Sequence, residues 1–390
     1  MRRLVNPAIR AFSVAGAVAT VAAGVASVTA SPLAAQGALS LQGFGYPQGQ
    51  LSTRAQGTAG ALGETDAASP LNPAALHGSG RTFFTFQIDP EFRSIEVGGR
   101  AVNTNVARFP LIAVGASVFS RGFVGVSFST LLDRSWDAAY DDSVLVGGQK
   151  VRSKVSTSVR GAISDGRLAF AWQFSDKLQA GAAFHVISGA NRMTLARAFT
   201  DSLTFGPLTQ NTTLSYGGAA VSAGILALPL PHVAVAASLR LGGGLSTRYD
   251  DTLATSGHVP NRYGLSVLYD GIPGSQIAVR VSRDQWSRLR SLGSASLMVN
   301  DATDVSAGLD VAGPKMRGLP TQFRLGARMR DLPFGWTGHV VKENSFAVGG
   351  QLPLARGWAS VDVALQRAVR TAGGVSEHAT SLSIGLTVRP

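Results

Sequence analysis

The chain of 390 residues is 45% hydrophobic and only 15% charged, which excludes an intrinsically disordered protein and allows one large domain or two ordinary ones. Its 46 glycines favour a β-rich protein over a helical bundle, and the absence of cysteine excludes disulfides, thiolate metal sites and a cysteine nucleophile. The formal net charge of +12 suits an anionic surface or anionic small molecules, whereas nucleic acid is disfavoured because the basic residues are scattered singly.

Residues 1–37 are expected to be a signal peptide for export. A basic stretch, residues 1–10, precedes an apolar run, residues 11–30, that ends in small residues, so cleavage is expected after Ala30 or Gly37. An uncleaved anchor is the alternative, although the alanine, glycine, serine and threonine content makes the run weakly hydrophobic. No later stretch approaches about 18 uninterrupted apolar residues, which leaves a soluble exported protein or a membrane β-barrel.

Residues 38–79 precede the first predicted strand and contain an unusual stretch. From Glu64 to Leu76 the sequence reads ETDAASPLNPAAL, and Pro70 and Pro73 have no backbone donor for a sheet. Alanine and glycine allow close approach to a wall, and Asn72 brings two donors and an acceptor to satisfy backbone groups. Two interpretations stay open: a plug inside a barrel, or an ordinary turn, since Asn-Pro is a common loop signal.

The rest of the chain, residues 80–390, alternates between apolar residues and small or polar ones with a period of two. In RLAFAWQFS, for example, Leu168, Phe170 and Trp172 share one face. The same alternation occurs in KLQAGAAFHV, HVAVAASLRL, QIAVRVS, TQFRLGARMR and TSLSIGLTV. The opposite face holds glycine, alanine, serine and isolated arginines, which is typical of the inside of a membrane barrel and not of a solvent-facing sheet.

Turn signals such as SDGR (residues 164–167), LPLPH and DGIPGS are expected to separate these stretches into hairpins. We therefore predict an all-β fold, a transmembrane antiparallel β-barrel of about 12 to 16 strands formed by residues 80–390. The polar inserts at residues 133–150 and 247–258 are expected to be external loops.

A short block, Asn72-Pro73-Ala74-Ala75-Leu76, ends the 38–79 segment directly before the alternating strands. It follows Arg54, Ala55, Gly57, Ala59, Gly60, Ala61, Asp66 and Ala67, and the later stretches PNRYGLSVLYDG, QIAVRVSRDQWSRLRSL, PTQFRLGARMRDLPF and SFAVGGQLPLARGWASVDVALQRAV read as paired strands. In this order, over most of residues 43–388, the chain resembles the outer-membrane long-chain fatty-acid and hydrophobic-compound transporter family. The resemblance implies a barrel of about fourteen strands with residues 38–79 inside as a plug, and Asn72, Pro73 and Ala74 as the plug motif. Related barrels that are not transporters, including the shuttle proteins of type IX secretion, share the block.

Inward-facing arginines are the one constellation with functional content: Arg240, Arg280, Arg324, Arg328 and Arg330. The acids that the alternation also places inside are Asp310 and Asp362. An excess of positive charge in a narrow channel would attract anions and hold a carboxylate head group. The alternative is internal ion pairing to the plug, for example through Glu64 or Asp66.

Motifs for catalysis or metal binding are lacking in the sequence. No G-x-S-x-G elbow occurs, and the six histidines are far apart. His185 falls on the inward face, either as a base in an outer-membrane lipase or as a satisfied polar residue of the lumen. The pairs Asp141-Asp142 and Asp250-Asp251 lie in predicted loops, where solvation is favoured over calcium binding. The sequence predicts no enzyme, no cofactor and no metal.

The resulting hypothesis is a passive channel in the bacterial outer membrane for hydrophobic or anionic amphipathic small molecules such as long-chain fatty acids. The alternative is a structural or protein-interaction barrel of the secretion-shuttle type, with a secretion partner protein. Outer-membrane lipid is expected as surroundings, nucleic acid is not expected as a partner, and the barrel-assembly machinery is expected to act during biogenesis. In the family that machinery reads a terminal aromatic residue, where this chain has Val388-Arg389-Pro390.

Overall fold

The computed structural model describes residues 44–97, 100–146, 149–201, 204–249, 252–292, 298–316 and 318–390. The expected signal peptide, residues 1–37, lies outside these ranges. The strands are β1 (Phe83–Val97), β2 (Arg100–Ser117), β3 (Gly122–Asp133), β4 (Trp136–Val146), β5 (Gln149–Ser175), β6 (Leu178–Phe199), β7 (Leu208–Leu230), β8 (Val233–Tyr249), β9 (Thr252–His258), β10 (Arg262–Tyr269), β11 (Ser275–Asp284), β12 (Ala302–Met316), β13 (Leu319–Trp336), β14 (His339–Leu354), β15 (Ala359–Ala372) and β16 (Val375–Val388).

The helical elements are short: α3 (Thr53–Gly57) and the 3-10 helices η1 (Pro73–Ser79), η2 (Trp286–Leu292) and η3 (Ala355–Gly357). Within the described ranges, none of the helices has the length and apolarity required to cross a membrane.

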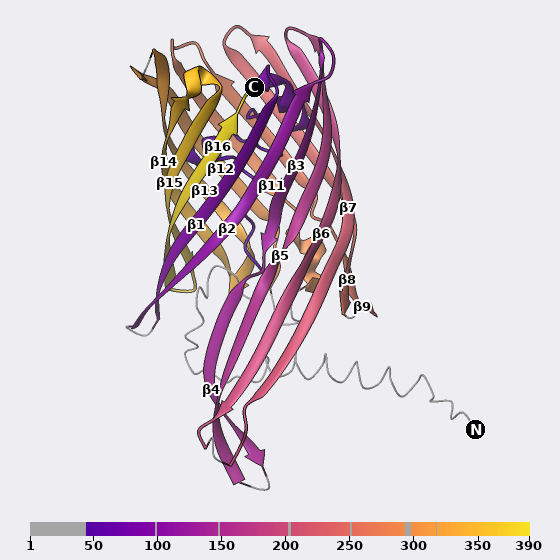
Figure 1. The fold of residues 1–390 in the computed structure, drawn as a ribbon, viewed down its shortest axis with the longest axis vertical. Coiled ribbons are helices and arrows are strands. Elements are labelled where there is room, and N and C mark those ends of the chain that lie inside the picture. The colour runs from indigo at the N-terminus through magenta and orange to yellow at the C-terminus, as the bar shows by residue number, and fades with distance from the viewer. Residues whose placement is uncertain are drawn as a thin grey trace, which may run out of the picture.

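The strands form one closed antiparallel barrel (Figure 1). Strand β16 pairs with β1, and β8 pairs with β10, which closes the ring. Of the 16 strands that the described ranges contribute to the sheet, β4 pairs with β5 and β9 with β8 as additions, so fourteen of them make up the ring itself. The prediction of an all-β antiparallel barrel of about fourteen strands is confirmed.

The wall shows the predicted alternation between its two faces. In β10 the exposed residues Tyr263, Leu265, Val267 and Tyr269 alternate with buried residues along the strand. Large apolar residues are exposed around the whole barrel, among them Phe170 and Phe323. An apolar surface of this extent is unfavourable in water and stable against lipid.

Two expectations about loops and turns are wrong. The polar insert at residues 133–150 contains β4 and the start of β5, and residues 247–258 contain the end of β8 and the whole of β9. The supposed turn at residues 164–167 lies inside β5, whose 27 residues form one strand. Polar and turn-forming side chains are tolerated there because the strand pairs on both sides, with β3 and β6, and backbone hydrogen bonds outweigh local propensity.

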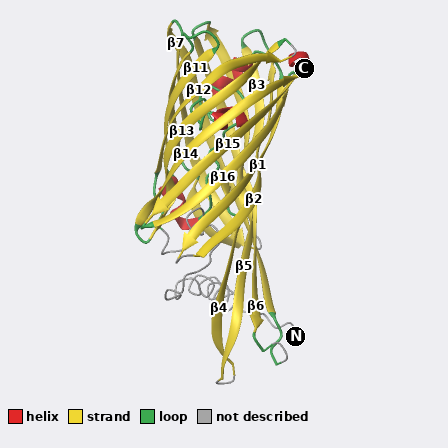
Figure 2. Cartoon of the chain, turned by 90° about the vertical axis from the view of Figure 1, so that its left-hand side faces the viewer, coloured by secondary structure: helices red, strands yellow, loops and turns green. Residues whose placement is uncertain are grey.

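The barrel has two different rims (Figures 1 and 2). The C-terminus and the short connections, such as residues 118–121, 176–177 and 231–232, lie at one rim. At the opposite rim, β4 and the ends of β5, β6 and β7 continue well beyond the other strands. We call these the turn rim and the projecting rim.

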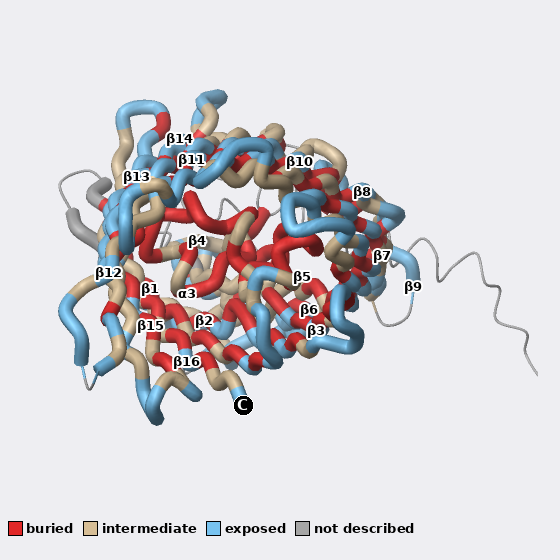
Figure 3. Tube along the Cα trace, turned by 90° about the horizontal axis from the view of Figure 1, so that it is seen from above, coloured by how far each residue is buried: buried red, intermediate tan, exposed pale blue. Residues whose placement is uncertain are grey.

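Residues 44–80, the inner segment, lie inside the ring, where the view along the barrel shows buried chain and α3 (Figure 3). The segment meets the wall first through a bridge between Tyr46 and Asp133, whose backbone groups exchange two hydrogen bonds of 2.7 and 2.9 Å. It then runs through α3 and ends in η1, which packs against β5, β6 and β7. The boundaries expected for this segment, residues 38–79, stay a prediction because the description begins at residue 44.

Glycines in the wall make room for the inner segment. A Cβ on Gly326 would overlap the backbone of Thr58, and one on Gly224 would overlap the side chain of Asn72. The same close approach occurs at Gly181, Gly264, Gly308, Gly349 and Gly385, each facing a residue of the inner segment. Glycine in the middle of a strand weakens a sheet, but at these positions it allows the inner segment to lie close against the backbone of the wall.

We expect Gly326→Ala to displace the inner segment, because overpacking against Thr58 costs roughly 1–3 kcal/mol while the backbone of β13 stays paired. Tryptic cleavage at Arg54 in the purified protein would measure the displacement, with an expected increase in rate of at least about fivefold. Gly244→Ala on β8 is the matched control, because its Cβ would meet nothing within 4 Å. Equal cleavage rates in the two variants would contradict the fit described.

Candidate functional site

An arginine cage surrounds Tyr46 near the start of the inner segment. The guanidinium groups of Arg93, Arg108, Arg330 and Arg370 lie 4.6 to 5.8 Å from the centre of its ring. The tyrosine hydroxyl donates to Glu343 Oε2 at 2.9 Å and accepts from Arg370 Nη2 at 2.9 Å. Cations over an aromatic face are attracted to it, more so away from water, so Tyr46 fixes the segment at this level of the lumen.

Glu64 fixes the middle of the segment. Its fully buried carboxylate forms ion pairs with Arg262 and, at 3.9 Å, with Arg280, and accepts a hydrogen bond of 2.7 Å from Ser238 Oγ. Burial by itself would raise the pKa of Glu64, but the two guanidinium groups and these hydrogen bonds lower it below its ordinary value. Glu64 is therefore a carboxylate in the docked segment, and its charge is matched by the wall.

Asp66 has a different role from Glu64. Its carboxylate accepts hydrogen bonds from Ser52 and Ser69, at 2.5 and 2.8 Å, and lies 3.9 Å from Arg54 of the same segment. These contacts hold two turns of the inner segment together. Arg54 then reaches Asp310 of the wall at 3.4 Å.

The predicted plug motif closes the segment near the turn rim. Asn72 accepts from the Ala74 N–H at 3.0 Å, which caps η1, and donates to the Ile225 carbonyl at 3.1 Å. Pro73 stands at the first position of η1, where no donor is needed. Pro73 and Ala74 lie against Gly181. The geometry suits a docked segment; the functional role of the motif stays a prediction.

The five arginines proposed as ligand groups all lie in the lumen wall and are all buried. Arg280 and Arg328 share Asp304, Arg324 binds Asp310 and Asp362, and Arg330 binds Glu343. Arg240 lies 3.7 Å from Asp165 and donates to Gln50 of the inner segment at 2.8 Å. These contacts favour the alternative of internal ion pairing.

The expected excess of positive charge in the lumen is not found in the described ranges. There, buried arginines and buried carboxylates occur in equal numbers. The sequence analysis placed only Asp310 and Asp362 inside, whereas the wall also buries Glu91, Asp165, Asp304, Glu343 and Glu377. The alternating stretches SFAVGGQ and TSLSIGLTV begin at residues 345 and 380, whereas β14 and β16 begin earlier and include Glu343 and Glu377.

Arg167 on β5 differs from the other lumen arginines. It is 4% exposed, it forms no ion pair with a described residue, and its Nε and Nη2 atoms have no hydrogen-bond partner. Directly across the strand pair lies Ser127 of β3, whose buried hydroxyl is also unpartnered. The sequence analysis missed Arg167 because it was assigned to a turn; as the residue before Leu168 in an alternating strand, it had to face inward.

His185 is satisfied at both ring nitrogens. Nδ1 contacts Asp165 at 2.8 Å and Nε2 contacts Ser222 Oγ at 2.8 Å. Gln50 of the inner segment also donates to Asp165, at 2.9 Å. His185 and Asp165 are at most 2% exposed, so this series of hydrogen bonds ties β5, β6 and β7 to the inner segment, in agreement with a satisfied lumen residue.

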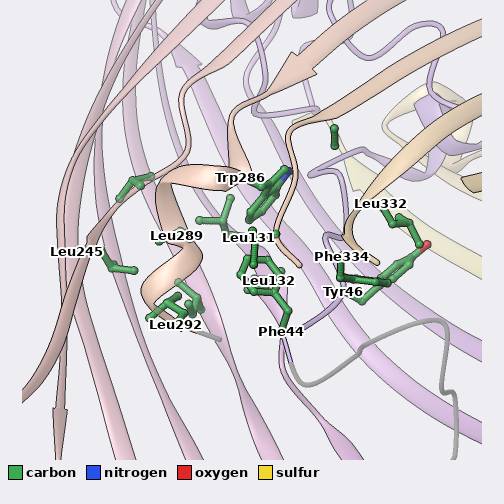
Figure 4. Close-up of a cluster of buried hydrophobic side chains, with 14 of the residues drawn as sticks. Phe44, Tyr46, Leu131, Leu132, Leu245, Trp286, Leu289, Leu292, Leu332 and Phe334 are labelled. Carbon is green, nitrogen blue, oxygen red and sulfur yellow. The ribbon is translucent and has the colours of Figure 1, made fainter. Parts of the chain in front are cut away.

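An apolar cluster fills the lumen at the projecting rim (Figure 4). It is formed by the inward-turned end of β3, the end of β13 and η2, and Phe44 of the inner segment packs edge-on against Trp286 at 6.1 Å. Its labelled members are Phe44, Tyr46, Leu131, Leu132, Leu245, Trp286, Leu289, Leu292, Leu332 and Phe334. The lumen mouth is thus apolar, whereas the deeper lumen is charged.

The wall is interrupted beside this cluster. Within the described ranges, strand β2 pairs with β3 only from Leu111 to Ser117, and residues 100–108 of β2 pair with β1 alone. Pro110, which has no backbone donor, stands where the pairing ends, and β3 turns inward there, with a register shift between Thr130 and Leu132. On the lumen side, an ion pair of 2.6 Å between Arg108 and Asp133 spans the interruption.

Comparison with known proteins gives similarity in structure alone. No protein-family model matches the chain, and no curated protein does. A Pseudomonas aeruginosa FadL homologue aligns with a TM-score of 0.60 at 12% identity, over 88% of this chain and 99% of that chain. The P. putida toluene transporter TodX gives 0.57 at 11% identity, over 88% and 99%, and the CymD monoaromatic hydrocarbon channel gives 0.53 at 14%, over 87% and 97%. The resemblance expected from the sequence is confirmed at the level of the fold.

We expect Glu64→Gln to loosen the inner segment at neutral pH. Removing one member of a buried ion pair leaves Arg262 and Arg280 short of a counter-charge and costs roughly 3–5 kcal/mol. Tryptic cleavage at Arg54 should rise by at least about a hundredfold. Glu64→Asp, which keeps the charge, is the control and should stay within about tenfold of the unmodified protein; equal rates for all three would contradict the role of Glu64.

We expect low pH to release the inner segment from the wall. The release would be measured as proteolytic cleavage of the segment, with a protease that is active at low pH in place of trypsin. Because the docked pKa of Glu64 lies below its ordinary value of 4.5, its contribution is fully present above about pH 4.5 and is lost as the pH falls through the lowered pKa. Glu64→Gln should lose this component of the pH dependence. Identical pH profiles for the two proteins would contradict the expectation.

Proposed function

We propose that this protein is a passive channel of the bacterial outer membrane for hydrophobic or amphipathic small molecules, with the inner segment as its plug and no chemical step. The observation that carries the proposal is the wall interruption between β2 and β3 beside the apolar mouth cluster. A molecule bound among apolar side chains there has a route through the wall into lipid that bypasses the charged lumen. The structural neighbours described as a toluene transporter and a monoaromatic hydrocarbon channel support this class of cargo.

Long-chain fatty acids are the cargo that we favour within this class. Arg167 and Ser127 offer unpartnered buried donors, and an apolar cluster adjoins them toward the turn rim through Ala169, Leu111 and Leu76. A carboxylate would supply the counter-charge that Arg167 lacks, and an alkyl chain would take the place of Leu76 of the inner segment. A neutral hydrocarbon would leave Arg167 unpaired. We therefore propose Arg167, in place of the five paired arginines, as the residue that binds the carboxylate head group.

The channel activity is tested by uptake of a labelled long-chain fatty acid into cells that express the protein. We expect faster uptake than in cells with an empty vector, and a similar gain for a labelled monoaromatic hydrocarbon if the route through the wall serves both. Unchanged uptake of both compounds would overturn the channel hypothesis. Co-purification of a stoichiometric protein partner without bound lipid would instead favour a barrel of the secretion-shuttle type.

Replacement of Arg167 separates the two kinds of cargo. Arg167→Gln should fold, because no described ion pair is lost, and should reduce fatty-acid uptake by about tenfold to a hundredfold through loss of a charge-assisted hydrogen bond. Uptake of the neutral hydrocarbon should be unchanged. Arg283→Gln, at an exposed arginine that lies 3.5 Å from Asp301, is the matched control. A loss of both cargoes in Arg167→Gln would argue against carboxylate recognition.

A further inference from the structure

The strands that project beyond the barrel form a sheet of their own. At the projecting rim β3 ends at Asp133, and β7 pairs with β8 only from Leu214 onward. Beyond this level, among the described residues, β4, β5, β6 and β7 pair only with one another. We call residues 136–146, 149–160, 190–199 and 208–213 the projecting sheet (Figures 1 and 2).

One face of the projecting sheet continues the lipid-facing side of the barrel. In β5 the exposed residues Leu168 and Phe170 have even numbers. Pairing of β5 with β6 runs without a register shift from Ser153 to Gln173, so even-numbered residues of both strands keep facing outward. The outward face of the projecting sheet therefore stands directly above the surrounding membrane.

This outward face is basic. It carries Lys150, Arg152, Lys154 and Arg160 of β5 and Arg192 of β6, all exposed. The only acids that the register places on the same face of the described sheet are Asp137 and Asp141. Asp137 pairs with Arg160 at 2.7 Å, and Asp141 lies directly opposite Lys154 without forming an ion pair. The four cations other than Arg160 form no ion pair with a described residue, so the face keeps an excess of three positive charges.

The arrangement is unfavourable for the sheet by itself. Lys150, Arg152 and Lys154 follow one another on one side of a strand, about 7 Å apart, and Arg192 lies directly opposite Arg160. Like charges at these separations repel, because they lie within the Debye length of about 8 Å. On the inward face, by contrast, Arg197 is paired with Asp142 at 2.9 Å. An anion bound between these cations would offset their mutual repulsion.

The distance of these cations from the lipid-facing apolar band limits which membrane anions can reach them. In β5 and β6 the large outward apolar side chains end at Val186, which pairs with Gly166. Farther out, at the end of the sheet, Leu145 of β4 is exposed opposite Lys150. Arg160 and Arg192 stand six residues farther along their strands, about 15 Å higher for a strand tilted by about 40°. A phospholipid head-group layer is only about 5–8 Å thick. Anionic groups at this height are carried on sugars rather than on a glycerol phosphate.

We propose that the outward face of the projecting sheet binds the phosphorylated saccharide of glycolipids in the outer leaflet around the barrel. The proposal rests on the outer-membrane location of the proposed function and on the usual orientation of such barrels, with the short turns on the periplasmic side and the projecting rim outside. It does not rest on transport. The five cations form a ladder that leads away from the membrane and meets successive phosphates along the saccharide. The contact would anchor the projecting sheet, which has barrel neighbours on neither edge.

Binding of two purified lipopolysaccharides, one with its phosphates intact and one dephosphorylated, tests the proposal with the full-length protein in detergent. The unmodified protein should bind the phosphorylated form at least about tenfold more tightly, and added salt should weaken that binding. The triple variant Lys150→Gln, Arg152→Gln, Lys154→Gln should lose about tenfold to a hundredfold in affinity for the phosphorylated form.

A second triple variant is matched in charge. Arg121→Gln, Lys177→Gln, Lys315→Gln removes three exposed cations near the turn rim and should bind as the unmodified protein does. Equal binding of both lipopolysaccharides, salt-independent binding, or an equal loss in both triple variants would overturn the proposal. Phosphatidylglycerol vesicles that bind as tightly as the phosphorylated lipopolysaccharide would also overturn it. Fatty-acid uptake should be normal in the first variant, so failure of the transport hypothesis would leave this result unaffected.

Discussion

The structure depends on charge compensation inside the barrel. A guanidinium group taken out of water is tolerated when a carboxylate meets it, and the wall of this barrel contributes arginines from most of its strands. Their partners come from neighbouring strands and also from the inner segment, which contributes Glu64. The segment also contributes Tyr46, whose ring and hydroxyl occupy the centre of the arginine cage. The barrel and its inner segment are therefore one electrostatic unit.

Close packing and this charge pattern act together. Asn72 and Thr58 lie close to the wall because the residues opposite them are glycines, Gly224 and Gly326. This close approach brings the rest of the inner segment within reach of hydrogen bonds and ion pairs to the wall. The inward turn of β3 has a similar double effect. It places Leu131 and Leu132 in the apolar mouth cluster, and it leaves residues 100–110 of β2 without a pairing partner on the side of β3. Closure of the lumen and interruption of the wall thus have one structural cause.

The fold could be predicted from the sequence because period-two alternation is a local property. Each stretch such as RLAFAWQFS shows its apolar face without reference to its neighbours, and the inward direction of Arg280 or Arg324 follows from the same count. The error at residues 164–167 also has a local origin. Asp165 and Gly166 read as a turn, but pairing with β3 and β6 on both sides holds them in one strand.

Residue pattern by itself determined the strand faces, the small and polar lumen, and an inner segment unsuited to a strand. Tertiary structure decided which charges meet. Asp304 joins Arg280 and Arg328 because β12 lies between β11 and β13 in a particular register. Arg167 has no ion pair with a described residue because Ser127 and His185, and no acid, lie opposite it. Register and the path of the inner segment are set by contacts between residues far apart in the chain. A one-residue shift would change every such partner, which no local pattern reveals.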